Sequence, residues 1–165
     1  MLSKKIEETL NKQINEETAS SYIYLAMAAY LESKNLHGMA SWMEEQSREE
    51  LKHALKIYNF VNERGGRVKL GALAAPQAEW ASAQAVFEEA YKHELKISGL
   101  INSLLTASLA EGDHATSNFL QWFVAEQVEE EASVLAIVEK FRMVGDHPSI
   151  LYLLDKELGK RAAAE

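Results

Sequence analysis

The sequence predicts an all-α protein, a four-helix bundle with one long crossover and a short fifth helix at the C-terminus. Apolar residues recur at every third or fourth position through four long stretches, which is the period of a helix with one buried face. The 165 residues include only two prolines and eight glycines, and most of these separate the stretches. The connection between the second and third stretches is much longer than the other two. We expect one domain, residues 1–165.

The first two long helices are expected over residues 5–34 and 36–64. On each helix, apolar residues at helical spacing form a line along one face, which we call its apolar line, and polar residues interrupt this line near its centre. Gly65 and Gly66 end the second helix, because glycine readily adopts the left-handed conformation that closes many helices. The apolar members of the two lines are Ile6, Leu10, Ile14, Tyr24, Ala28 and Leu31, then Met39, Met43, Ile57 and Phe60.

The third and fourth helices are expected over residues 82–111 and 113–144. Ser82 and Asp113 are suitable N-caps, because their side-chain oxygens can accept hydrogen bonds from the free N–H groups of a first turn. A glycine follows each helix. The apolar members of these lines are Phe87, Ala90, Ile97, Ile101 and Leu104, then Leu120, Phe123, Val134, Ile137 and Phe141.

The connections determine the topology. The first and second helices, and the third and fourth, are joined by only a few residues, so each pair forms an antiparallel hairpin. The connection of about 16 residues between the pairs can cross the bundle, so the second and third helices run parallel. Pro148 fits a first turn and opens the fifth helix, which ends at about Leu158.

A carboxylate interrupts the apolar line near the middle of each long helix. The spacing is regular: 33 residues within each half of the chain, and an offset of 77 between the halves. The interrupting residues are Glu17, Glu50 with His53, Glu94, and Gln127 with Glu130. Mid-helix positions lie at the same height in a bundle, so these groups converge. A buried carboxylate without a partner is costly, so four of them predict a multivalent cation.

A site for two metal ions fits better than a site for one. Four carboxylates carry a charge of −4, which two divalent ions balance, while a neutral His53 adds nothing. Glu50 faces both halves of the site and can bridge the ions. Oxygen and nitrogen ligands suit iron, manganese or zinc. Tyr24, two turns after Glu17, favours redox-active iron because a phenol can supply an electron or a hydrogen bond; the alternative for Tyr24 is packing.

These motifs resemble the ferroxidase centre of prokaryotic non-haem ferritins over nearly the whole chain. The matching residues are Glu17, Tyr24, Glu49, Glu50, His53, Glu94, Glu126, Gln127 and Glu130. The resemblance implies a homo-oligomeric shell of 24 subunits that oxidises Fe(II) with O2 or H2O2 and stores a ferric mineral. It also implies that the fifth helix packs at a four-fold axis; the alternative is a helix folded back on its own bundle.

The resemblance also implies the ligands of each iron. One iron takes Glu17, Glu50 and His53. The other takes Glu50, Glu94 and Glu130, with Gln127 close by. A third iron site would use Glu49, Glu126 and Glu129, sometimes with Glu130; the alternative for these three outer acids is simple surface charge.

At several positions the sequence differs from related families, and these differences narrow the prediction of cofactor and channel. Leu51 follows Glu50 where bacterioferritins carry a haem-binding methionine, so haem is not expected. Ser117 and Leu120 replace the acids that line the three-fold channels of animal ferritins. Trp122 lies off the central line, and packing explains it better than electron transfer does.

The composition argues against several other classes of protein and kinds of metal site. Without cysteine there is no disulfide, iron–sulfur cluster or rubrerythrin-type iron site. A net charge of −8 argues against nucleic acid, and no apolar run is long enough for a membrane span. With no signal peptide recognised, we expect a cytoplasmic protein. The alternatives are a di-iron oxidase or oxygenase, a rubrerythrin-like peroxide scavenger, or a structural bundle with vestigial carboxylates.

Overall fold

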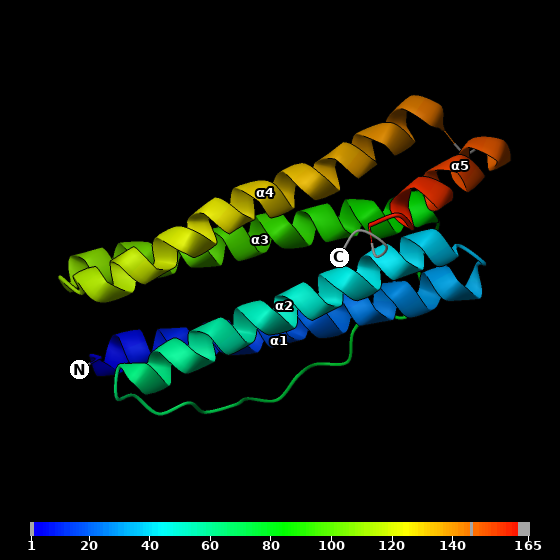
Figure 1. The fold of residues 1–165 in the computed structure, drawn as a ribbon. Coiled ribbons are helices and arrows are strands. Elements are labelled where there is room, and N and C mark those ends of the chain that lie inside the picture. Colours follow the sequence, from blue (N-terminus) through cyan, green and yellow to red (C-terminus); the bar gives the residue numbers. More distant parts are fainter. Residues whose placement is uncertain (1, 146, 162–165) are drawn as a thin grey trace.

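The computed structural model describes residues 2–145 and 147–161, and these residues form five helices and no strand. The helices are α1 (Lys4–Ser33), α2 (His37–Glu63), α3 (Ala83–Ala110), α4 (His114–Val144) and α5 (Pro148–Leu158) (Figure 1). Each expected helix is present, and its bounds lie within one residue of the prediction. The all-α fold class is confirmed.

Helix caps explain several of these bounds. The Ser82 side chain accepts a hydrogen bond from Ala85 N at 3.1 Å, and Asp113 Oδ1 accepts one from Thr116 N at 3.1 Å. Both predicted N-caps are therefore confirmed. Gly145 follows α4 with a φ of 60°, a left-handed conformation that few other residues adopt easily.

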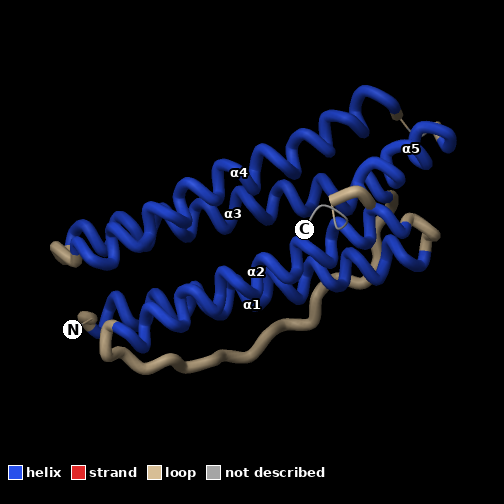
Figure 2. Tube along the Cα trace, viewed as in Figure 1, coloured by secondary structure: helices blue, strands red, loops and turns tan. Residues whose placement is uncertain are grey.

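The two hairpins α1–α2 and α3–α4 lie side by side, and the crossover between them runs along the first hairpin for most of its length (Figures 1 and 2). Side chains of α1 hold this crossover in place. Asn11 Oδ1 accepts a hydrogen bond from Lys69 N at 2.6 Å, and Asn15 Oδ1 accepts one from Gly71 N at 3.1 Å. The crossover therefore has a defined course although it contains no helix.

The apolar core consists of two clusters with a polar layer between them. One cluster includes Met27, Met43, Phe87 and Phe141, and the other includes Leu10, Ile57, Leu104 and Phe123. Every long helix contributes to both clusters and passes from one to the other through its buried polar residues. The predicted interruptions of the apolar lines thus share one layer in the middle of the bundle.

The fifth helix folds back on its own subunit, against α2 (Figure 1). Leu154 and Leu158 are buried in the same core cluster as Met43. For these two residues the alternative stated for the fifth helix, that it folds back on its own bundle, is confirmed, because they pack into the core of their own subunit. Tyr152 and Leu153 remain exposed, so α5 still presents an apolar face outward.

The start of α2 depends on α5. Leu36, at the N-cap position, supplies no side-chain hydrogen bond. Instead, Asp155 of α5 accepts a hydrogen bond from Met39 N through Oδ1 at 2.8 Å. A Cβ atom added to Gly38 would lie 1.8 Å from the Asp155 carbonyl oxygen, so only glycine permits this approach. Among the described helices, none combines the length and apolar character needed to cross a membrane.

Candidate metal centre

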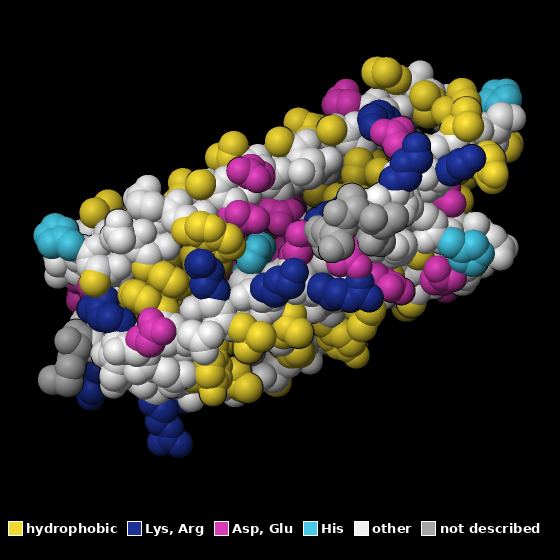
Figure 3. All heavy atoms as spheres, viewed as in Figure 1, with side chains coloured by type: hydrophobic (Ala, Val, Ile, Leu, Met, Phe, Trp, Pro, Cys, Tyr) yellow, Lys and Arg dark blue, Asp and Glu magenta, His cyan; other side chains and the backbone are white. Residues whose placement is uncertain are grey.

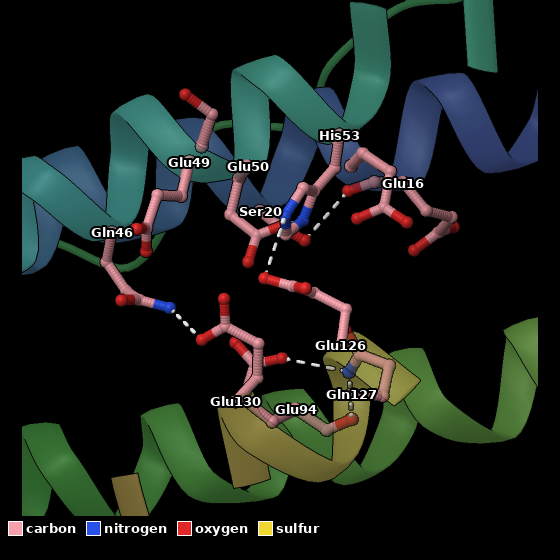
Figure 4. A network of polar contacts seen from close by, with 12 residues as sticks. Glu16, Ser20, Gln46, Glu49, Glu50, His53, Glu94, Glu126, Gln127 and Glu130 are labelled. Carbon is pink, nitrogen blue, oxygen red and sulfur yellow. Dashed lines mark hydrogen bonds and ion pairs between the residues drawn. The ribbon is translucent and has the colours of Figure 1, made fainter. Parts of the chain in front are cut away.

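The six polar side chains that interrupt the apolar lines are all buried in the polar layer, none of them more than 6 % exposed. They come from all four long helices: Glu17 on α1, Glu50 and His53 on α2, Glu94 on α3, and Gln127 and Glu130 on α4. Figure 4 shows Glu50 and His53 facing Glu94, Gln127 and Glu130 across the bundle. The structure therefore brings together all the residues that the spacing singled out.

Ligand atoms gather in two groups that overlap at His53. In the first, one atom from each of Glu17, Glu50 and His53 lies within 4.8 Å of the others. In the second, atoms of His53, Glu126 and Glu130 meet the same condition. The first group coincides with the ligand set expected for one iron. The second shares only Glu130 with the set expected for the other iron, because His53 and Glu126 stand in it in place of Glu50 and Glu94.

Glu94 is held by two hydrogen-bond donors. The Tyr24 hydroxyl donates to Glu94 Oε1, and Gln127 Nε2 donates to Glu94 Oε2 at 3.1 Å. Gln127 Nε2 also lies 3.2 Å from Ser98 Oγ. Because its amide nitrogen faces Glu94, Gln127 positions a carboxylate in this arrangement.

Two carboxylate oxygens in the layer lack any partner among the described residues. Glu17 Oε2 and Glu50 Oε1 are buried and accept no hydrogen bond. The other oxygen of Glu17 accepts a hydrogen bond from Gln13 Nε2 at 2.9 Å, and Glu50 Oε2 lies 3.3 Å from His53 Nδ1. Buried oxygens without partners are rare because their desolvation is not compensated. Hard oxygen donors beside an imidazole are suitable ligands for divalent iron, manganese or zinc.

The buried carboxylates of the polar layer repel one another when they are charged. Burial, reinforced by the neighbouring Glu50, raises the pKa of Glu17 well above its usual value. Burial and the charge of Glu94 likewise raise the pKa of Glu50, and raise that of Glu130 to about 7. Among the described residues, no lysine or arginine forms an ion pair with the layer's four carboxylates, Glu17, Glu50, Glu94 and Glu130. A bound cation would relieve this repulsion and release protons.

Comparison with known proteins agrees with this geometry. The ferritin-like domain family matches residues 7–144 of the chain. The chain belongs to the ferritin family. It is 38 % identical over 161 residues to a bacterial non-heme ferritin of Bacteroides fragilis (strain 638R), covering 98 % of this chain and 100 % of that one. A bacterial non-heme ferritin of Staphylococcus aureus (strain MRSA252) is 37 % identical over 165 residues, covering 100 % and 99 %.

Solved structures show the same fold. A ferritin of the hyperthermophilic archaeon Archaeoglobus fulgidus, described as an open pore ferritin, superposes with a TM-score of 0.95. It is 52 % identical to this ferritin and covers 96 % of this chain and 98 % of its own. The fold predicted from the apolar lines is therefore that of a ferritin subunit.

The three outer acids of this ferritin lie in different surroundings. Glu126 Oε1 lies 3.9 Å from His53 Nε2, which places it at the edge of the layer. The Glu49 carboxylate accepts a hydrogen bond from Arg161. Glu129 is exposed, and it belongs to neither group of ligand atoms among the described residues. Glu126 thus belongs to a group of ligand atoms, whereas Glu49 lines the same pocket as His53 and Glu126 but is paired with Arg161.

An open pocket of about 490 Å³ reaches the layer from the face between α2 and α4. His53 and Glu126 line it, together with Lys52, Lys56 and Trp122. The Trp122 ring packs edge-on against His53, with ring centroids 5.4 Å apart. Figure 3 shows acidic side chains gathered on this face, with basic side chains beside them.

Two amides near the centre had no role in the sequence-based prediction. Gln13 donates to Glu17, and Gln46 Nε2 donates to Glu130. Each lies four residues before a glutamate of the layer, so the two pairs, 13 with 17 and 46 with 50, repeat at the same spacing of 33. That repeat is the signal by which the sequence could have identified them.

Proposed function

We propose that this ferritin oxidises Fe(II) at the buried layer and stores the ferric product inside a homo-oligomeric shell of 24 subunits. The observation that carries the proposal is the pair of unpartnered oxygens on Glu17 and Glu50, which lie beside His53 in a layer of buried acids. The match to the ferritin family over residues 7–144 supports iron as the metal.

Iron is the substrate here. Glu17, Glu50 and His53 would hold one Fe(II), and Glu130 would hold a second with Glu94 or Glu126. Each Fe(II) gives up one electron, so a pair of ions matches the two-electron reduction of O2 to H2O2, or of H2O2 to water. The protein contributes by holding both ions in one buried layer and leaving positions open for the oxidant.

Tyr24 and Gln127 would act on the oxidation through Glu94. Both donate to its carboxylate, which fixes the direction of the lone pairs that can face iron. Burial, then the charge of Glu94, raises the pKa of Tyr24 well above its usual value, so the phenol keeps its proton. A neutral phenol in this place can also supply an electron.

The pocket between α2 and α4 would admit ferrous iron to the layer. It reaches His53 and Glu126 directly, and Glu126 is the most exposed member of the two ligand groups. An acid at the mouth of a buried acidic site attracts cations.

Aerobic addition of Fe(II) to the purified apo-protein tests the proposal. We expect ferric absorbance to rise faster than in protein-free buffer, and the iron to co-elute with a species of roughly 450 kDa, from 24 chains of 18.5 kDa. Oxidation without retained iron would favour an oxidase or oxygenase. No accelerated oxidation would favour a structural bundle.

A further inference from the structure

Arg161, just beyond α5, reaches back to α2 and contacts the edge of the polar layer. Its Nη1 donates a hydrogen bond to Gln46 Oε1 at 2.6 Å, and its Nη2 donates to Glu49 Oε2. The guanidinium also stacks over Trp42, 4.7 Å from the ring centroid. Arg161 therefore has three partners, Trp42, Gln46 and Glu49, and all of them lie on α2.

The docking of α5 holds Arg161 in this place. Asp155 caps α2, Gly38 lets the two backbones touch, and Leu154 and Leu158 insert into the core. These contacts lie within two turns of Arg161. The position of the guanidinium thus follows from a packed helix.

The contacts of Arg161 continue into the layer. Gln46 accepts from Arg161 through its oxygen and donates to Glu130 through its nitrogen. Arg161 therefore fixes the orientation of the Gln46 amide. This orientation directs Gln46 Nε2 toward Glu130, a candidate metal ligand. The second partner of Arg161, Glu49, directly precedes Glu50 in the chain and lines the open pocket.

We propose that Arg161 is a built-in cation that occupies Glu49 and thereby limits the centre of this ferritin to two metal ions. The proposal rests on the proposed two-metal function. The guanidinium carries a positive charge and donates from a planar fork that matches a carboxylate. A third metal ion at Glu49 would have to displace this group.

Anaerobic calorimetric titration of the assembled apo-protein with Zn²⁺, which is not oxidised, tests the proposal. We expect two ions per subunit in the wild type and three in Arg161→Gln, with the third bound at least tenfold more tightly than any third ion in the wild type. Adding Glu49→Gln to Arg161→Gln should return the count to two. Arg161→Lys, which keeps a cation but not the fork, should give an intermediate affinity.

Arg142→Gln is the matched control, because Arg142 pairs with Glu139 on the surface of α4; it should leave two ions. Two ions of unchanged affinity in Arg161→Gln would overturn the inference, as would three in the wild type. Glu49→Gln alone should keep two ions, and this variant decides the question if Arg161→Gln does not assemble: a lost ion would show that Glu49 binds metal beside Arg161. Fewer than two ions in the wild type would instead refute the two-metal centre.

Discussion

The Tyr24 hydroxyl donates a hydrogen bond to Glu94 across the bundle, from α1 to α3, and both side chains are fully buried. This contact joins the two hairpins through the polar layer. It also lowers the cost of charging Glu94, whose pKa is raised by burial and lowered by the Tyr24 and Gln127 donors.

Tyr24→Phe should leave two metal ions bound but change the course of iron oxidation. Only the phenol oxygen is lost, so the packing stays, while Glu94 loses one donor and its pKa should rise further. We expect a lower initial rate near neutral pH in stopped-flow measurements. Kinetics identical to those of the wild type would reduce Tyr24 to a packing residue.

Glu50→Ala or His53→Ala should slow fast iron oxidation at least tenfold while the shell still assembles. Both residues belong to the first group of ligand atoms. Removing a buried charge need not reduce stability and can increase it. Initial oxidation rates and size-exclusion profiles test both statements, with Glu139→Ala on the surface of α4 as a control. An unchanged rate in Glu50→Ala would contradict the two-metal assignment.

The apo-protein should become less stable as the pH rises from about 4.5 to above 7. The folded state binds a proton at Glu130 up to a pKa of about 7, whereas the unfolded chain releases it near 4.5. At Glu130 the folded state holds more protons in that window, so the free energy of unfolding falls with rising pH, by roughly 3 kcal/mol for this group alone. Burial also raises the pKa values of Glu17 and Glu50, which adds to the fall, whereas His93, whose pKa burial lowers to about 4, opposes it below pH 6.5.

Thermal melts of the apo-protein at pH 5.5 and pH 8 measure this effect, and Glu130→Gln should reduce it. Bound Zn²⁺ should reverse the trend, because metal and proton compete for the same oxygens. A melting temperature of the apo-protein that rises between these two pH values would contradict the arrangement of buried acids.

Gly38→Ala should loosen α5. The added Cβ would overlap the Asp155 carbonyl, so either the helices move apart or the cap on Met39 is lost, at a cost of about 1–3 kcal/mol. Gly99→Ala is the matched control: a Cβ there meets no described atom, and alanine should stabilise α3 by up to about 1 kcal/mol. Thermal melts compare the two. Equal effects would show that α5 does not depend on this contact.

Removing all residues after Gly145 should leave a helical, metal-binding protein whose shell loses mineral. The truncation removes Leu154 and Leu158 and so uncovers the core cluster against which they pack. It also removes the exposed apolar face at Tyr152 and Leu153. We therefore also expect a lower melting temperature than that of the full chain. Full iron retention in a stable 24-subunit shell of the truncated chain would show that α5 is dispensable.

The helices and the buried layer could be predicted from the sequence because both depend on local period. Apolar residues repeat with the helical turn, and a glutamate on such a line must be buried. Ser82 and Asp113 could be predicted as caps for the same local reason. The ligand set could not be fully predicted: whether Glu94 or Glu126 approaches Glu130 depends on side-chain rotamers and on the donors that hold Glu94.

The role of α5 could not be predicted because it depends on contacts between distant residues. Asp155 and Arg161 meet α2 across more than 110 positions of sequence. No periodicity relates such pairs. The sequence predicts the fifth helix, but the part of the bundle that it covers depends on its contacts with α2, including the close approach that Gly38 allows.

The division of the core into two apolar clusters has a mechanical consequence. Without metal, the buried acids of the two hairpins face each other in the middle of the bundle, joined there by the hydrogen bonds from Tyr24 to Glu94 and from Gln46 to Glu130, and the apolar clusters pack the hairpins together on either side. Two divalent ions ligated from both hairpins would act as an inorganic crosslink at that point. Loading would then add protection at the centre of each long helix, so amide hydrogen exchange should slow there first, before any mineral forms.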